Sequence, residues 1–177
     1  HGIPDKHRII HEGDIVSLDA GVIYKGYHSD AARTHAVGEV SEEAKKLIQV
    51  TKECFFEGIK YAKAGNHLFD ISGAIGRYAE ERGYGVVRDL CGHGIGTALH
   101  EAPEIPNYEV GRKGVKLRPG MTLAIEPMIN IGTYEVDWLD DDWTVVTRDG
   151  SLSAHYENTI LITEGEPRIL SLTCDNE

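Results

Sequence analysis

The 177-residue sequence has few cysteines and no long apolar segment. Its three cysteines, Cys54, Cys91 and Cys174, form no C-x-x-C pair, which argues against a disulfide framework or a zinc knuckle. They predict free thiols in a reducing compartment. No apolar run approaches the roughly 20 residues of a membrane-spanning helix, and no secretory signal is expected. We therefore expect a cytoplasmic protein without a membrane partner.

Positive charge is also scarce. Lysine and arginine total 18 against 29 aspartate and glutamate residues, which gives a formal charge of −11. The phosphates of nucleic acids would be repelled, so DNA is not an expected partner. The sequence is 41% hydrophobic and 27% charged, as is typical of globular proteins, and we expect residues 1–177 to form a single domain.

Five side chains that favour metal ions are spread along the chain: Asp19, Asp30, His93, Glu126 and Glu157. Four carboxylates and one imidazole suit hard or borderline divalent ions, and a pair of such ions is well suited to hydrolysis. Taken singly, a histidine is more often an ordinary polar residue, and a buried glutamate is as often ion-paired. Together, the five residues favour a shared metal centre.

The first two carboxylates lie on a predicted β-hairpin. Residues 14–23 alternate like a strand, Lys25-Gly26 supplies a two-residue turn, and residues 28–37 return. In this register Asp19 and Asp30 share one face along a diagonal, with backbone positions about 7–8 Å apart. A three-residue loop would turn Asp30 to the other face.

Two helices are predicted after the hairpin. Apolar residues at helical spacing predict one helix over 41–64, with Ser41 as its N-cap and Gly65 as its stop. The same pattern predicts a second helix over 70–82, with Asp70 as its N-cap. Both helices carry an apolar stripe for packing on a core.

Further strands are predicted around residues 85–90, 121–129, 143–148 and 154–163. Glu126 and Glu157 each lie inside one of these apolar strands. Burying an unpaired carboxylate costs several kcal/mol, so each glutamate needs a cation or a hydrogen-bond donor.

Two histidine segments lie between these elements. Gly92-His93-Gly94-Ile95-Gly96 places an imidazole between glycines, which permit close approach of backbone or ligand. His100-Glu101-Ala102-Pro103 presents a second imidazole. The other histidines that we interpret as solvated surface groups are His7, His11, His28, His35 and His67.

These segments together resemble the methionine aminopeptidases, in particular the short bacterial type I form. The resemblance covers nearly the whole chain, in order and at the family's spacing. It implies the pita-bread fold, an α/β (α+β) architecture with a curved antiparallel sheet and helices on its outside. The matching segments are His1-Gly2-Ile3-Pro4, Asp19 through Asp30, the two histidine segments, Glu126-Pro127-Met128 and Ser153-Ala154-His155-Tyr156-Glu157.

The resemblance implies removal of N-terminal methionine from nascent proteins and peptides, by a hydroxide that two divalent metal ions (Co, Mn, Fe or Zn) activate. Asp30 and Glu157 would bridge the ions and Asp19 would complete the shell of one. His93 and Glu126 would complete the other, with Glu126 also acting as a proton shuttle.

The resemblance also implies roles on the substrate side. His100 would bind the substrate and stabilise the tetrahedral intermediate, and His1 would contact the scissile amide. Trp143 would form a wall of the methionine pocket, with an ordinary core or surface tryptophan as the alternative. Ser153 would lie at a site for a monovalent cation.

The match departs from the family at its start. Members carry an N-terminal segment, including part of the methionine pocket, before the His-Gly-Ile-Pro motif. We therefore expect a truncated fragment that binds metal but is impaired unless the missing piece is supplied separately, and whose exposed apolar flank favours self-association. An Xaa-Pro dipeptidase of the same fold and an inactive binding module are the alternatives.

One basic cluster stands out in the acidic chain. It lies in a Gly/Pro-rich loop and consists of Arg112, Lys113, Lys116 and Arg118. Such a run is usually a solvated loop. Because the family acts on nascent chains, the hypothesis is that this loop contacts ribosomal RNA.

Overall fold

The computed structural model describes residues 1–172, so Cys174 lies outside the described part. Those residues contain α1 (Glu42–Ile59), α2 (Leu68–Glu80) and the long strands β1 (Ile15–Tyr24) and β2 (Tyr27–Ala36). No helix of residues 1–172 has the length and apolar character needed to cross a membrane. The shorter strands are β3 (Gly85–Val86), β4 (Gly92–Gly94), β5 (Glu101–Ile105), β6 (Thr122–Ile125), β7 (Met128–Asn130), β8 (Val136–Trp138), β9 (Val145–Thr147), β10 (Ser153–His155), β11 (Asn158–Leu161) and β12 (Arg168–Ile169).

β1 and β2 form the predicted hairpin with the predicted register. Tyr24 pairs with Tyr27, and Asp19 pairs with Ala32. The turn residues Lys25 and Gly26 have φ values of 51° and 83°, the positive values that a tight two-residue turn of this kind requires. Asp19 and Asp30 therefore share one face of the hairpin, as the two-residue turn predicts.

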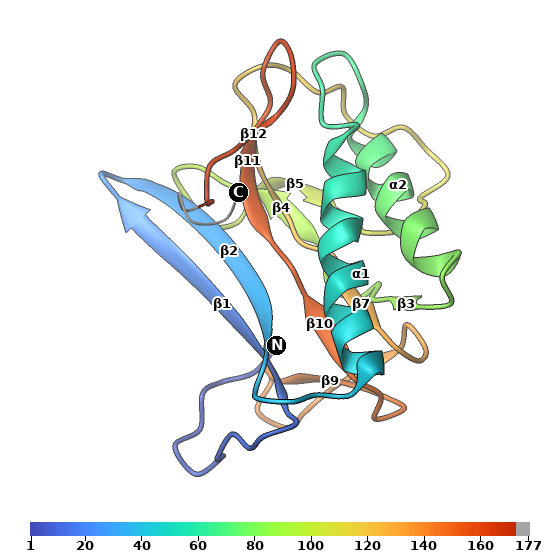
Figure 1. Ribbon diagram of the computed structural model, residues 1–177. Coiled ribbons are helices and arrows are strands. Elements are labelled where there is room, and N and C mark those ends of the chain that lie inside the picture. The colour runs from blue at the N-terminus through green and yellow to red at the C-terminus, as the bar shows by residue number, and fades with distance from the viewer. Residues whose placement is uncertain (173–177) are drawn as a thin grey trace.

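The hairpin projects away from the helices as a long ribbon, drawn in blue in Figure 1. Within residues 1–172, β1 is hydrogen-bonded to no strand other than β2. Leu18, Val22 and Tyr24 of β1 are 59%, 60% and 70% exposed, so an apolar face of the ribbon lies open to solvent.

Helix α1 begins as predicted and ends earlier than predicted. The Ser41 hydroxyl accepts a hydrogen bond from the Ala44 N–H at 3.1 Å, which caps the first turn. The predicted helix runs to residue 64, but α1 ends at Ile59. There the chain tightens into a turn in which the Tyr61 N–H donates to the Gly58 carbonyl at 3.0 Å.

Helix α2 begins at Leu68, two residues before its predicted start, so the prediction of Asp70 as its N-cap is wrong. The N-cap residue is His67, and Asp70 lies inside the first turn. Its carboxylate accepts a hydrogen bond from the His67 N–H at 2.8 Å. Asp70 thus still stabilises this helix end, by reaching back to the cap rather than by forming it.

The strands predicted around Glu126 and Glu157 are each divided in two, because both glutamates lie outside the ladder. Ile125 pairs with Asn158 before the interruption, and Met128 pairs with His155 after it. The register is the same on both sides, which places Glu126 opposite Glu157. Across the gap the Tyr156 N–H donates to the Pro127 carbonyl at 3.2 Å. Pro127 has no N–H to donate, which explains part of the break.

β2 joins this strand pair from its other side. Ala32 and Glu157 exchange two backbone hydrogen bonds, at 2.9 and 3.4 Å. One step along, the Thr159 hydroxyl accepts from the Asp30 N–H at 2.8 Å and donates to the Asp30 carbonyl at 3.0 Å. The hairpin is therefore continuous with the antiparallel strands that carry the two glutamates.

The hydrophobic core lies between the two helices and the central strands. α1 and α2 lie side by side, and α1 packs against β10 and β7 (Figure 1). The largest fully buried core side chains include Phe55 and Leu47 of α1, Ile71 and Ile75 of α2, and Leu123, Ile125 and Ile160 of the sheet.

Candidate metal and substrate site

The structure brings the five predicted metal-binding side chains into one cluster. Donor atoms of Asp30, His93 and Glu157 lie within 4.8 Å of one another. Nε2 of His93 lies 3.4 Å from Oε1 of Glu126, so Glu126 is a fourth member of the cluster. Asp19 adjoins Asp30 across the hairpin. Segments far apart in the sequence therefore supply one group of donors.

The two aspartates differ in exposure. Asp30 is buried, and its Oδ1 accepts a hydrogen bond from the Ala31 N–H at 3.1 Å. The Asp19 side chain is 40% exposed at the rim of the cluster. Burial raises the pKa of the Asp19 carboxyl, His155 opposes this shift, and Asp30 adds to it by repulsion. A cation between the two carboxylates would relieve that repulsion.

His93 is held with one ring nitrogen facing the cluster. Nδ1 lies 2.9 Å from the Gly94 carbonyl, to which it can donate, and this leaves Nε2 facing the cluster. The flanking glycines are required by close packing. A Cβ on Gly92 would lie 2.4 Å from the Ala124 carbonyl oxygen, and one on Gly94 would lie 2.2 Å from that of Ala102. The expected close approach of backbone is confirmed.

Glu126 and Glu157 are buried, with 6% and 1% of their surfaces exposed. Burial raises the pKa of Glu126 to about 8, and burial together with repulsion from Glu126 raises that of Glu157 to about 10. Oε1 of Glu157 has no hydrogen-bond partner among the described residues. Two buried carboxyls with raised pKa values and an unpartnered oxygen fit a site built for cations.

His155, a further imidazole in the cluster, was not predicted as a site residue. The sequence pattern identified its segment only through Glu157. Its ring is buried, and Nε2 lies 3.5 Å from Oε2 of Glu126. Burial lowers the pKa of His155, which keeps the ring neutral. A polar residue two positions before the predicted ligand Glu157 was the available signal, but the strand ends at His155, so strand alternation did not place the two residues on one face.

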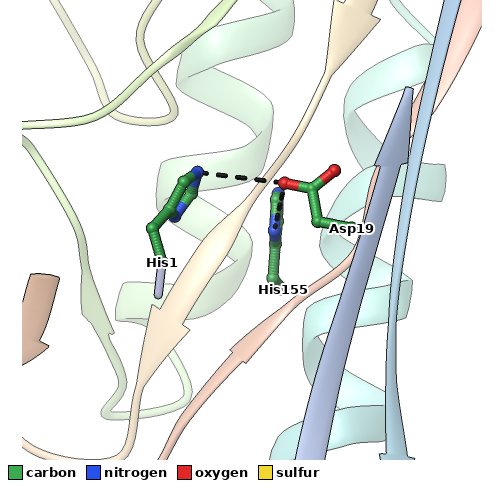
Figure 2. Close-up of side chains that lie close together, drawn as sticks. All are labelled: His1, Asp19 and His155. Carbon is green, nitrogen blue, oxygen red and sulfur yellow. Dashed lines mark ion pairs between the residues drawn. The ribbon is translucent and has the colours of Figure 1, made fainter. Parts of the chain in front are cut away.

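The Asp19 carboxylate lies near two imidazoles, those of His1 and His155, as Figure 2 shows. Its Oδ2 is 4.0 Å from Nε2 of His1 and 3.9 Å from Nδ1 of His155. The two rings stack with centroids 5.4 Å apart. The rim of the cluster is therefore richer in nitrogen donors than the predicted set of one imidazole.

A cavity of about 970 Å³ opens beside the cluster. The three residues predicted on the substrate side, His1, His100 and Trp143, all line it, as do His93 and Glu126. The His100 ring lies edge-on to the His93 ring, with centroids 4.4 Å apart. Trp143 is 56% exposed, so it forms an open wall rather than part of the core. The lining also includes apolar side chains that sequence reasoning missed, among them Leu90, Cys91, Trp138 and Val145.

Ser153 lies apart from this cavity. It lines a second cavity of about 680 Å³, and its hydroxyl donates to the Ile129 carbonyl at 3.3 Å. The basic cluster, by contrast, lies beside the start of α2. The Phe69 N–H donates to the Lys113 carbonyl at 3.1 Å, and the Arg112 guanidinium lies over the Phe69 ring, 5.4 Å from its centroid. Arg112 also lines the 970 Å³ cavity.

Comparison with known proteins gives a consistent assignment. The family model for metallopeptidase family M24 matches residues 1–164. A methionine aminopeptidase from Clostridium acetobutylicum is 61% identical over 172 residues, which cover 97% of this chain and 69% of that relative. The similarity therefore includes every segment of the cluster.

Solved structures show the same relation. A crystal structure of a methionine aminopeptidase from Thermotoga maritima has a TM-score of 0.95 and 50% identity, over 98% of this chain and 70% of that one. A prolidase from Pyrococcus furiosus has a TM-score of 0.73 and 29% identity, over 93% of this chain and 43% of that one. This chain shares its architecture with both proteins, and its TM-score and sequence identity are higher with the aminopeptidase than with the prolidase.

Proposed function

The chain belongs to metallopeptidase family M24, in its bacterial type I methionine aminopeptidase branch with the pita-bread fold, and we propose that its reaction takes place between the acidic cluster and the 970 Å³ cavity. Its activity is hydrolytic removal of methionine from the N-terminus of a peptide. The observation that carries the location is that Glu126 and His93 of the cluster line that cavity, together with His1 and His100.

The family implies a divalent metal, and the donor set supports a site for two ions. Asp30 and Glu157 would be shared between the ions. Asp19 would complete one shell, and His93 and Glu126 the other. Oxygen-rich ligation with imidazole suits Mn, Fe, Co or Zn. Bound divalent ions supply Lewis acidity, which polarises a peptide carbonyl and lowers the pKa of water.

Glu126 is proposed to hold and move the proton of the reaction. Its carboxyl lies at the cavity wall beside His93, where it can accept and return a proton. The Asn107 amide donates to the Glu126 carbonyl at 3.1 Å and fixes the backbone of this residue. Asn107 thereby keeps the carboxyl aimed at the cavity.

His100 and His1 are proposed to bind the peptide around the scissile bond. Both line the cavity beside the cluster, and His100 adjoins His93. An imidazole N–H at that position can donate a hydrogen bond to the carbonyl oxygen as negative charge develops on it. His1 would contact the amide on the leaving-group side.

The apolar part of the cavity is proposed to hold the methionine side chain. Trp143 and Trp138 supply aromatic walls, and Leu90 and Cys91 supply aliphatic and thiol surface. A thioether makes favourable contacts with aromatic rings, and its flexible chain adapts to an irregular pocket.

The test is hydrolysis of Met-Ala-Ser by the metal-loaded chain, compared with the Glu126→Gln variant. The variant should lose roughly 100- to 10,000-fold in kcat/KM, the usual contribution of a proton-transferring group. Glu164→Gln, which removes an exposed carboxyl outside the site, serves as the matched control and should retain activity. Turnover by Glu126→Gln at the level of the control would overturn the proposed role.

The same assay separates the alternatives. Methionine aminopeptidase relatives are more similar to this chain than the prolidase, so cleavage of Met-Ala-Ser should exceed cleavage of an Xaa-Pro dipeptide. A chain that binds metal with the expected stoichiometry but cleaves neither peptide would be an inactive binding module.

Two partner and location proposals remain. We propose that the basic cluster Arg112, Lys113, Lys116 and Arg118 contacts ribosomal RNA, because it is a concentration of positive charge next to the cavity. Reversing all four charges should reduce co-sedimentation with ribosomes, and unchanged co-sedimentation would contradict the proposal. The free thiols Cys54 and Cys91 support a reducing, cytoplasmic location.

A further inference from the structure

The loop between β8 and β9 carries Trp143 and is closed by its own hydrogen bonds. Within residues 1–172, the two strands form a sheet of their own. The Leu139 N–H donates to the Thr144 carbonyl at 2.9 Å, and the Asp142 N–H donates to the Leu139 carbonyl at 3.1 Å. Asp142 has a φ of 56°, a left-handed value that aspartate adopts more readily than most residues. The backbone therefore turns back on itself directly before Trp143.

The Asp141 carboxylate holds the backbone on which the Trp143 ring is mounted. Its Oδ1 accepts hydrogen bonds from the Trp143 N–H at 3.0 Å and the Thr144 N–H at 2.7 Å. Its Oδ2 accepts from the Thr144 hydroxyl. The Thr144 hydroxyl and the two N–H groups lower the pKa of Asp141, so the group is ionised and accepts from all three donors at neutral pH. Beyond the loop, the Val145 N–H donates to the His1 carbonyl at 3.0 Å, which anchors the next strand.

Trp143 borders two cavities. It lines both the 970 Å³ cavity beside the cluster and the second cavity of 680 Å³, and His1 and Val145 also line both. Met128 and Val136 add apolar surface to the second cavity. Because the Trp143 ring is 56% exposed, packing in the core does not fix its position. The loop that carries the ring therefore decides where the border between the two cavities lies.

We propose that Asp141 is a positioning residue that holds the Trp143 ring between the two cavities and so limits the space open to the first residue of the substrate. The inference rests on the proposed function, in which Trp143 is a wall of the methionine pocket. Without the carboxylate, the loop loses the acceptor for two N–H groups and a hydroxyl, the ring leaves the border, and the cavities join. A joined cavity holds methionine less closely and admits a larger side chain. Asp141 itself lines neither cavity, so it acts through Trp143.

The kinetic test compares the metal-loaded protein with Asp141→Ala. The KM for Met-Ala-Ser should rise about 10-fold while kcat changes less than about 3-fold, because the lost contact is made equally in the ground state and the transition state. Phe-Ala-Ser serves as a competitor with a larger first residue. The ratio of its inhibition constant to the KM for Met-Ala-Ser should fall about 10-fold, a usual contribution of fit in a hydrophobic pocket.

Two variants separate the hydrogen bonds of Asp141 from its charge. Asp141→Asn keeps a side-chain oxygen that can accept from both N–H groups, so its KM should stay within about 3-fold of the unsubstituted value. Asp140→Ala removes the neighbouring exposed carboxylate and should leave KM and the inhibition ratio unchanged. Equal effects of Asp140→Ala and Asp141→Ala would show that only negative charge matters, which would contradict the proposal.

The fluorescence of Trp143 gives a readout that does not depend on turnover. The chain has two tryptophans, so Trp138→Phe leaves Trp143 as the only one. In that background, Asp141→Ala should enlarge the fast component of the anisotropy decay, because the ring gains freedom, and Asp140→Ala should not. An identical decay in all three proteins would overturn the proposal.

The kinetic outcomes are equally decisive. An unchanged KM and inhibition ratio in Asp141→Ala would overturn the proposal, as would a fall in kcat with KM unchanged, because the residue would then not act on the pocket. If the unsubstituted protein cleaves no Met-Ala-Ser, the proposed function fails instead. The anisotropy decay still measures how Asp141 holds Trp143 in that case, so the two failures are distinguishable.

Discussion

Glu126 and Glu157 lie directly opposite each other in an antiparallel strand pair that is interrupted at both residues. Because neither takes part in the ladder, their side chains are released from the strict alternation of a strand. Two buried carboxyls then face one region, where each raises the free energy of ionising the other. The free energy of unfolding should therefore depend on pH and on bound divalent metal.

The first prediction concerns the metal-free protein. The pKa values of Glu126 and Glu157, about 8 and about 10, lie above the ordinary value of 4.5. The folded chain therefore binds more protons than the unfolded chain over this range, so its stability falls as pH rises. With a chelator present, Tm should be highest near pH 5 and should fall toward pH 9. A Tm that rises with pH would contradict the assignment, and Glu157→Gln should flatten the slope.

Divalent metal should reverse that trend. Ligands must be ionised to bind, so protons and metal compete for the same carboxyls. At a metal concentration about 100 times Kd, the folded state gains about 2.7 kcal/mol, which raises Tm by roughly 5–10 °C in a domain of this size. The gain should be larger at pH 8 than at pH 5, as measured by scanning calorimetry with MnCl₂ or CoCl₂. An equal gain at both pH values would refute ligation by carboxyls of raised pKa.

Thr159 should matter to the metal centre although it is not a ligand. Its hydroxyl satisfies both backbone groups of Asp30. Thr159→Val leaves a buried N–H and a carbonyl unpaired, and we expect a loss of about 1–3 kcal/mol of stability per lost partner. Metal affinity should fall about 10-fold or more because Asp30 is no longer held. Thr159→Ser keeps the hydroxyl and should behave like the unsubstituted protein in both titrations and thermal unfolding.

Arg33 should support Glu157 through charge and hydrogen bonds together. Its guanidinium donates to the Ala32 carbonyl and the Asn158 side chain, each at 2.7 Å, and to the Glu157 carbonyl. Arg33→Met should raise the pKa of Glu157 further and weaken metal binding about 10-fold near pH 7. Arg33→Lys keeps the charge but not the fork of donors, so an intermediate affinity is expected. Equal affinities in the three proteins would exclude this role.

The glycines beside His93 should tolerate no side chain. Gly94→Ala would place a Cβ 2.2 Å from a backbone oxygen, so the strand must shift and His93 with it. We expect a loss of roughly 3 kcal/mol in the free energy of unfolding, at the upper end for overpacking. Gly165→Ala, where a Cβ would meet no atom within 4 Å, is the matched control and should be near neutral. A neutral Gly94→Ala would contradict the packing argument.

Local rules predicted the parts of the fold where turn and cap chemistry decides the outcome. The Lys25-Gly26 turn fixed the register that puts Asp19 and Asp30 on one face, and Ser41 marked the start of α1. The helix ends were displaced because tertiary packing and tight terminal turns compete with an apolar stripe. Strands β4, β5, β8 and β12 were missed, since they are short and β4 is mostly glycine.

Some features of the site could be predicted from the sequence, and others could not. The buried glutamates were recognisable because an isolated carboxyl in an apolar strand needs a partner. The interruption of both strands at Glu126 and Glu157 was not, because it depends on how two segments meet across the sheet. His155 was missed for the same reason. Its contacts with Asp19 and Glu126 arise from three separate segments, and no local pattern encodes them.

The threonine bridge between Asp30 and Thr159 spans 129 positions of the chain. Closing so long a loop is entropically costly and makes a folding step slow. During synthesis the hairpin that bears Asp19 and Asp30 emerges early, yet its partner strand appears only when residue 161 has been added. Until then Asp19 and Asp30 lack the segment that carries Glu157, so the proposed metal site is incomplete. A metal site shared by Asp30 and Glu157 is therefore completed only after the segment that carries Thr159 has been synthesised and has folded onto the hairpin.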